Sequence, residues 1–260
     1  MIMGRENSKA KTGLTSVTFR KKTCEEVIAI AKANNLDGIE WGGDIHVPCG
    51  DLENAKRVGE LTRAAGLQVF SYGSYYWAGK QGFDTVCRTA EALGCKVVRI
   101  WSAHKSSVDC TEEDYEQTAQ KLRMVSDIAK EYDITVCMEF HNNTINDTGA
   151  SSVKLLEMVD RENIRTYWQP LYEYDDNVRD IAALGEYVVN LHVYNWSYGK
   201  EGKPTIRKML TDDASSWQTY IDMMKRHNCA HNYIIEFCKE DSDENFAADA
   251  EFLNNCIDFN

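Results

Sequence analysis

The chain has 260 residues, enough for one large domain or two small ones, and 43% of them are hydrophobic. Its formal net charge is −12, which argues against nucleic acid as a partner because nucleic-acid binders usually carry basic surfaces. No apolar stretch approaches the roughly 18–20 residues of a membrane helix, and the first 13 residues lack the apolar region of a secretory signal. We therefore expect no membrane partner.

The cysteine pattern indicates a reducing environment. The nine cysteines are scattered, their number is odd and no CxxC pair occurs. This pattern is typical of reduced thiols in a protein without structural disulfides or a zinc knuckle. A cytoplasmic location is expected.

Apolar runs alternate with helical patterns along the whole chain. Strands are expected over 14–19, 38–41, 67–72, 96–101, 134–140, 163–168, 187–194 and 233–237. Helices are expected near 23–35, 51–65, 81–93, 111–132, 150–161, 175–185, 214–228 and 242–257. Thr23 and Glu26 have the spacing of a capping box, and Gly66 and Gly94 stand where helices should end.

Eight strand–helix units without a Pro- or Gly-rich linker favour the α/β class and a single (β/α)8 TIM barrel over residues 14–260. Residues 1–13 are then an N-terminal extension. A doubly wound sheet is the alternative, but no GxGxxG motif follows the first strand. In a TIM barrel the active site lies at the C-terminal ends of the strands, so polar residues there are the candidates.

Polar side chains do stand at these predicted strand ends. They are Glu40, Arg99, Glu139, Gln169, His192 and Glu236. Two carboxylates and an imidazole are typical ligands of a hard divalent metal. Charged side chains inside a barrel need a metal or an opposite charge, so internal ion pairs such as Arg99 with Glu40 are the alternative interpretation.

Four segments resemble the xylose-isomerase-like TIM barrels, the family of sugar-phosphate isomerases and epimerases that also includes apurinic (AP) endonucleases of family 2. They are LDGIEWGGDIHVP, MEFHNNTINDT, YWQP and LHVYNW, and the resemblance covers nearly the whole chain. It implies a metal held by Glu139, Gln169, His192 and Glu236. Gln169 is a departure, because the better-studied epimerases have an aspartate there.

The resemblance implies a divalent cofactor, with Mn²⁺ or Mg²⁺ expected and Zn²⁺ as an alternative. An amide oxygen can bind a cation but adds no charge, so we expect binding to be weaker than in the family. A barrel that has lost its metal is the other interpretation. Glu139 and Glu236 are the expected catalytic acid and base, which would move a proton beside a carbonyl through an enediolate.

Further residues are candidates for substrate binding. Glu40 and Arg99 stand at strand ends, and His141 follows Glu139 on the same face. Trp101 and Trp196 offer aromatic faces to a sugar ring, although packing is equally common for tryptophan. His46 and Lys239 follow strand ends and could contact a hydroxyl or an anionic group. The long segment 195–213 is a candidate lid, from which Lys203 or Arg207 could reach a substrate.

The sequence thus favours an isomerase or epimerase of a sugar or sugar phosphate, with a small carbohydrate as the partner. A dehydratase or lyase for a keto-sugar or keto-inositol needs the same first step and stays an alternative. A metal-free carbohydrate-binding barrel is a third interpretation, which Gln169 keeps open. An AP endonuclease is disfavoured by the acidic charge and by the small set of metal ligands. A homo-oligomer would be in keeping with the family.

Overall fold

Eight parallel strands close into a barrel, which confirms the predicted single-domain (β/α)8 TIM barrel. The computed structural model describes residues 10–171, 176–197, 206–227 and 231–258. The barrel strands are β1 (Lys11–Thr15), β2 (Gly38–Gly42), β3 (Gln68–Trp77), β4 (Val97–Trp101), β5 (Thr135–Met138), β6 (Ile164–Trp168), β7 (Val188–Val193) and β10 (Asn232–Ile235). They follow the order β1-β10-β7-β6-β5-β4-β3-β2 around the barrel.

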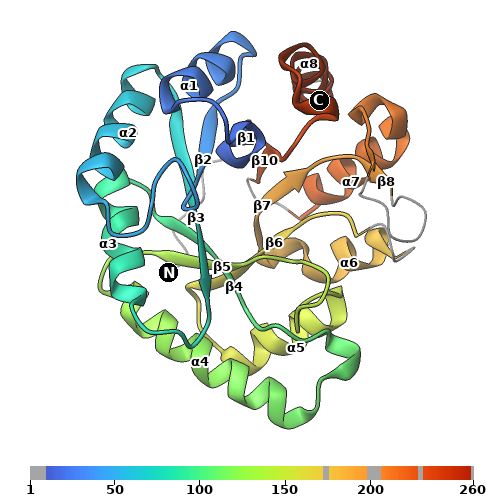
Figure 1. The fold of residues 1–260 in the computed structure, drawn as a ribbon. Coiled ribbons are helices and arrows are strands. Elements are labelled where there is room, and N and C mark those ends of the chain that lie inside the picture. The colour runs from blue at the N-terminus through green and yellow to red at the C-terminus, as the bar shows by residue number, and fades with distance from the viewer. Residues whose placement is uncertain (1–9, 172–175, 198–205, 228–230, 259–260) are drawn as a thin grey trace, which may run out of the picture.

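Helices surround the barrel and bury its outer face (Figure 1). They are α1 (Cys24–Ala33), α2 (Leu52–Ala64), α3 (Phe83–Leu93), α4 (Glu112–Lys130), α5 (Gly149–Val159), α6 (Asn177–Leu184), α7 (Ala214–Lys225) and α8 (Asp243–Asp258). Thr23 and Glu26 form the predicted capping box of α1. Gly94 follows α3 with φ +81°, a left-handed conformation that glycine adopts without strain.

The first strand differs from its prediction over 14–19. It begins at Lys11, and Ser16–Phe19 form a 3-10 turn. Hydrophobicity misled the prediction because Phe19 is buried in a turn, where it packs edge-on against Phe246 with ring centroids 5.1 Å apart. Of the expected extension 1–13, residues 1–9 lie outside the described residues and 11–13 belong to β1.

Two further departures shape the barrel mouth. Strand β3 runs five residues beyond its expected end, to Trp77, and its pairing with β4 shifts between Gly73 and Trp77. After β7, a short antiparallel pair joins β8 (Trp196–Ser197) to β9 (Ile206–Arg207). Both features place side chains above the C-terminal ends of the strands.

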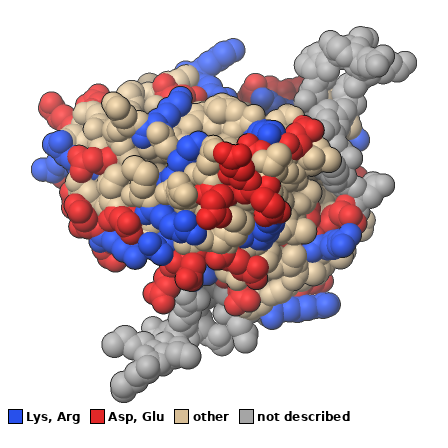
Figure 2. Space-filling model, turned by 90° about the horizontal axis from the view of Figure 1, so that it is seen from below, with Lys and Arg blue, Asp and Glu red and all other residues tan. Residues whose placement is uncertain are grey.

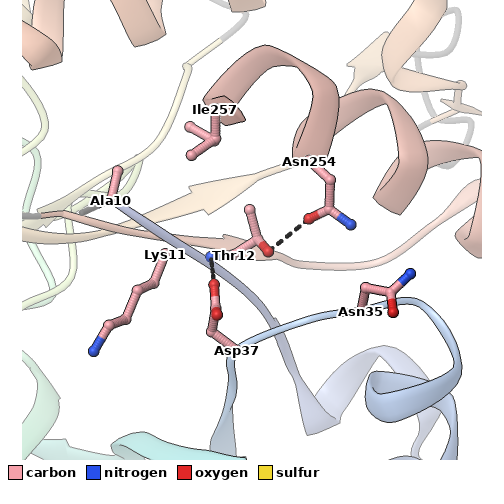
Figure 3. A pocket seen from close by; sticks show the side chains of 7 residues that line it. All are labelled: Ala10, Lys11, Thr12, Asn35, Asp37, Asn254 and Ile257. Carbon is pink, nitrogen blue, oxygen red and sulfur yellow. Dashed lines mark hydrogen bonds between the residues drawn. The ribbon is translucent and has the colours of Figure 1, made fainter. Parts of the chain in front are cut away.

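The opposite end of the barrel is tied together by side chains around Thr12. A cavity of about 470 Å³ lies there (Figure 3). The Thr12 N–H donates to Asp37 at 2.9 Å, and its hydroxyl donates to Asn254 at 2.7 Å. Asn254 in turn donates to the carbonyl of Asn34 at 3.0 Å. These bonds fasten α8 to the first strand and first helix, a stabilising role typical of this end of a TIM barrel.

The surface carries both signs of charge. On the face shown in Figure 2, Asp and Glu side chains are interspersed with Lys and Arg. Within the described part of the chain, no helix combines the length and apolar character needed to cross a membrane.

Candidate functional site

Four polar residues from neighbouring strands meet at the C-terminal end of the barrel. Glu139 follows β5, Gln169 follows β6, His192 lies in β7 and Glu236 follows β10, and these strands are consecutive around the barrel. His192 Nδ1 lies 3.0 Å from Gln169 Oε1, 3.3 Å from Glu236 Oε2 and 3.8 Å from Glu139 Oε1. All four side chains are buried. The structure therefore brings the predicted ligand set together.

The backbone fixes both glutamates at the edge of the sheet. The Glu139 N–H donates to the Ile100 carbonyl at 2.9 Å, and the Glu236 N–H donates to the Val193 carbonyl at 2.9 Å. These bonds continue the barrel's ladder by one residue past the last paired strand positions. The two carboxylates are thus held by rigid strands and not by loops.

Glu40 supports the cluster from the inside of the barrel. Its Oε1 lies 3.1 Å from His192 Nε2 and accepts from Arg99 Nε at 3.2 Å. Its Oε2 accepts from the hydroxyls of Ser71 and Tyr167, each at 2.7 Å. Four partners occupy both oxygens of this fully buried carboxylate, so neither oxygen is left for the substrate contact that the sequence suggested. Glu40 instead orients His192 and Arg99. The contact of Nε2 with Glu40 fixes the ring so that Nδ1 points towards the other ligands.

Arg99 joins Glu40 to Glu139. Its Nη1 forms an ion pair with Glu139 Oε2, and its side chain is 2% exposed. Gly73 makes room for the guanidinium, because a Cβ at that position would lie 2.7 Å from Arg99 Nη2. The internal ion pair of Arg99 with Glu40 that the sequence suggested is therefore present, and it lies beside the ligand cluster.

The protonation of the cluster follows from burial and these charges. Burial alone would lower the pKa of His192, but Glu236 and Glu40 outweigh it and raise that pKa to about 10. Burial raises the pKa of Glu139, and the opposing effect of Arg99 does not cancel the rise. Burial alone would raise the pKa of Glu236, but the charge and hydrogen bond of His192 together with the charge of Arg99 outweigh it and lower that pKa. One glutamate is thus disposed to hold a proton while the other stays ionised.

The donor set fits a divalent cation. One donor atom each from Glu139, His192 and Glu236 lie within 4.8 Å of one another. A divalent cation would take the place of the protons that His192 and Glu139 hold without it, because the three ionised carboxylates, Arg99 and a neutral His192 together carry two negative charges. Gln169 adds an oxygen without altering that balance. These residues form a candidate metal site whose oxygen and nitrogen donors suit Mn²⁺, Mg²⁺ or Zn²⁺.

Aromatic side chains line the mouth next to Glu139. Trp101 stacks on Trp77 with centroids 5.1 Å apart, and His141 meets the edge of Trp101 at 4.9 Å. His104 also stacks on Trp77. Trp101 and His141 are partly exposed, as substrate contacts must be. The structure brings these two predicted residues together and adds Trp77 from the extended end of β3.

Of the other predicted binding residues, Trp196 lies near Glu236, whereas His46 and Lys239 have backbone partners away from the cluster. His46 is buried in the loop after β2, where its Nε2 lies 3.0 Å from the Lys22 carbonyl and burial lowers its pKa. Lys239 begins a short 3-10 turn, and its backbone carbonyl accepts from the Asn245 side chain. Trp196 stacks on Tyr194 with centroids 4.5 Å apart and borders Phe237 at 5.5 Å, beside Glu236. Lys203 falls outside the described residues.

Several residues of the network escaped the sequence analysis. Tyr167 donates to Glu40 and accepts from Asn190 at 2.6 Å. These two residues stand two positions before Gln169 and His192, so they face the barrel interior by the alternation of a strand. That spacing was the available signal. Ser71, which donates to Glu40, and Tyr75, whose ring lies 5.6 Å from the guanidinium carbon of Arg99, carried no comparable signal, because their positions depend on the course of β3.

Comparison with known proteins agrees with this geometry. The model of the family described as xylose isomerase-like TIM barrel matches residues 28–256. A 3-dehydroshikimate dehydratase of Bacillus anthracis is 22% identical over 202 residues, which cover 72% of each chain.

Solved structures show the same fold. The crystal structure described as that of the probable 3-DHS dehydratase AsbF from Bacillus anthracis has a TM-score of 0.80 at 19% identity, covering 94% of this chain and 99% of that one. A D-psicose 3-epimerase from Clostridium cellulolyticum H10 has a TM-score of 0.71 at 13% identity, covering 95% of this chain and 99% of that one. At these identities the likeness concerns the fold, and both epimerases and a dehydratase share it.

Proposed function

Because this chain belongs to the xylose isomerase-like TIM barrel family, we propose that it is a metal-dependent enzyme that isomerises or epimerises a sugar or related polyhydroxy carbonyl compound. The reaction begins with removal of a proton from the carbon next to the carbonyl. Glu139, Gln169, His192 and Glu236 would hold the cation. When bound, it would polarise the carbonyl and stabilise the developing negative charge.

The observation that carries this proposal is the convergence of two buried glutamates, Glu139 and Glu236, on His192 at the C-terminal end of the barrel. Glu236, with a lowered pKa, stays ionised and takes the proton from the substrate carbon. Glu139, whose pKa burial raises, donates its own proton to the neighbouring or inverted carbon, and both carboxyls then regain their starting states by proton exchange with solvent. Arg99 keeps the Glu139 carboxyl in one orientation during this exchange. Isomerisation and epimerisation both need such a donor–acceptor pair.

A dehydratase is the second candidate, and His141 favours it. Expelling water needs an acid to protonate the leaving hydroxyl, and His141 stands two residues beyond Glu139 against Trp101. The similarity to the 3-dehydroshikimate dehydratase supports this outcome, as do the neighbouring epimerases for the first. Both outcomes share the proton removal at Glu236.

Proton NMR in D₂O separates the two outcomes. Mn²⁺-loaded protein is incubated with D-psicose, L-ribulose and 3-dehydroshikimate. Deuterium incorporation without loss of water identifies an isomerase or epimerase, and loss of water identifies a dehydratase. Glu236→Gln should abolish either reaction while circular dichroism stays unchanged. Exchange that persists in this variant, or that is absent from all three compounds with the wild type, would contradict the proposal.

The setting of the enzyme is part of the same proposal. A small carbohydrate-like molecule is its partner, without nucleic acid or membrane. A cytoplasmic location is supported by the cysteines of the described residues, all of which are free thiols.

A further inference from the structure

The backbone bends sharply directly after Glu236. Strand β10 ends at Ile235, and Glu236 lies one residue beyond it. Phe237 then has φ +64°, a left-handed conformation that a residue with a Cβ adopts only at a cost in free energy. The next residue, Cys238, is extended again, with φ −143°. The chain therefore leaves the barrel through a single strained residue, and that residue adjoins one of the two glutamates of the candidate site.

One buried hydroxyl holds both residues that flank Glu236. Thr18 lies in the 3-10 turn after β1 and is buried. Its Oγ1 accepts from the Phe237 N–H at 2.9 Å and donates to the Ile235 carbonyl at 3.4 Å. Between these two bonds, the Glu236 N–H donates to the Val193 carbonyl of β7. The backbone around Glu236 is thus fixed to both neighbouring segments of the barrel, β7 on one side and the turn after β1 on the other.

The ring of Phe237 makes separate contacts with the short hairpin after β7. The guanidinium carbon of Arg207 lies 4.3 Å from its centroid, and the centroid of the Trp196 ring lies 5.5 Å from it. Strained conformations persist only where the surroundings hold them in place. Here the surroundings consist of the ring contacts and the Thr18 hydroxyl, and substitutions at the two positions can separate them.

Glu139 is held in a comparable way. Its N–H donates to the Ile100 carbonyl, and its own carbonyl accepts from Asn146 Nδ2 at 2.9 Å. Asn146 is fully buried. Each glutamate therefore lies one residue past the end of its strand, where a buried polar side chain holds the backbone. Support of this kind is what a precise constellation of ligands or catalytic groups requires.

We propose that Thr18 is a positioning residue of the candidate site. Its hydroxyl holds Phe237 in the left-handed conformation and thereby keeps the Glu236 carboxylate directed towards Glu139 and His192. Without the hydroxyl, the Phe237 N–H loses this acceptor and the strained backbone relaxes, so that Glu236 is less well aligned. Thr18 acts through the backbone and not by contact with the cation. This inference rests on the proposed function, which assigns Glu236 to the cation and to the substrate proton.

Calorimetric titration with Mn²⁺ alone tests this role. Thr18→Val replaces the hydroxyl by a methyl group of similar size, and we expect the dissociation constant to rise by about tenfold or more. Thr18→Ser keeps the hydroxyl and should bind Mn²⁺ as the wild type does. Thr89→Val is the matched control, because the buried Thr89 hydroxyl of α3 accepts from the Gly50 N–H at 3.0 Å and donates to the Thr85 carbonyl at 2.7 Å. It should lose stability in urea as Thr18→Val does, but keep the wild-type affinity.

Substitutions at Phe237 separate conformation from packing. Glycine adopts the left-handed conformation without strain, whereas a β-branched residue such as valine adopts it very rarely. Phe237→Gly and Phe237→Val both remove the ring, but only Phe237→Val should weaken Mn²⁺ binding. Adding Phe237→Gly to Thr18→Val should restore the affinity, because the bend then needs no support.

Wild-type affinity in Thr18→Val, an equal loss in Thr89→Val, or equal affinities in Phe237→Gly and Phe237→Val would each overturn the positioning role and leave the proposed function intact. If Thr18→Val does not fold, the two Phe237 variants decide the question by themselves. A wild type that binds no Mn²⁺ would instead defeat the proposed function, and the positioning role with it.

Discussion

His192 Nε2 lies 3.1 Å from Glu40 Oε1, on the side of the ring that faces away from the candidate metal ligands. Both side chains are fully buried, and Glu40 is itself held by Arg99, Ser71 and Tyr167. The carboxylate therefore determines which nitrogen of His192 is available to a cation. A side chain that contacts no substrate thus controls the geometry of the site.

Removing the charge of Glu40 should weaken metal binding. In Glu40→Gln the amide cannot accept from both His192 and Arg99 as a carboxylate does, so the ring is oriented less firmly. We expect the dissociation constant for Mn²⁺ to rise by about 10–100-fold, measured by calorimetry. Glu60→Gln, an exposed change on α2, serves as the control. An unchanged Mn²⁺ affinity in Glu40→Gln would show that His192 needs no such support.

Restoring a carboxylate at position 169 should strengthen metal binding. Gln169→Asp adds a negative charge to a cluster that already contains Glu139 and Glu236. Because affinity rises with the charge of the ligands, we expect the dissociation constant for Mn²⁺ to fall by about tenfold. Gln169→Asn keeps the shorter length without the charge, and it should not show the gain. Tighter binding in both variants would attribute the effect to side-chain length instead.

Gly73→Ala should damage the site without touching a ligand. The new Cβ would lie 2.7 Å from Arg99 Nη2 and 3.3 Å from Glu40 Oε1, so the guanidinium must move. We expect a loss of about 1–3 kcal/mol in the free energy of unfolding, measured in urea, and a lower kcat. Wild-type stability together with wild-type turnover would mean that Arg99 can shift without consequence.

The buried carboxyl of Asp249 should make stability fall as pH rises. Burial raises its pKa to about 6, and its Oδ1 accepts from the Leu210 N–H at 2.8 Å. Between pH 4 and 6 the folded state therefore binds more protons than the unfolded state, so stability is lost as the pH rises through 6.

Asp249→Asn keeps the acceptor without the charge. At pH 8 it should raise the free energy of unfolding by up to about 2–3 kcal/mol, and the gain should vanish near pH 4. Urea denaturation at both pH values checks this. A gain of the same size at pH 4 and pH 8 would exclude ionisation as its cause.

The sequence predicted what depends on periodicity along one element. Glu139, His192 and Glu236 were found because they end apolar runs whose carboxyl ends must meet in a parallel barrel. The capping box of Thr23 and Glu26 was predicted correctly because it depends only on the spacing of two residues within one helix turn.

Features that depend on irregular backbone were missed. The shift in β3 after Gly73 brings Tyr75 over Arg99 and Trp77 against Trp101. No periodic pattern announces such a shift. Glu40 was recognised as a strand-end residue, but its four partners come from four other strands, so only the folded barrel reveals that none of its oxygens remains for a substrate.

The barrel is closed by pairing Lys11 with Asn232, from the two ends of the chain. Such distant pairing is slow to form, because a long loop must close before it is stabilised. During synthesis the first seven strands emerge before β10, and Glu236 arrives only with that last strand. A nascent chain that lacks β10 therefore lacks one of the two glutamates of the candidate site. The Glu139–Glu236 pair is assembled by the same pairing of strands that completes the barrel.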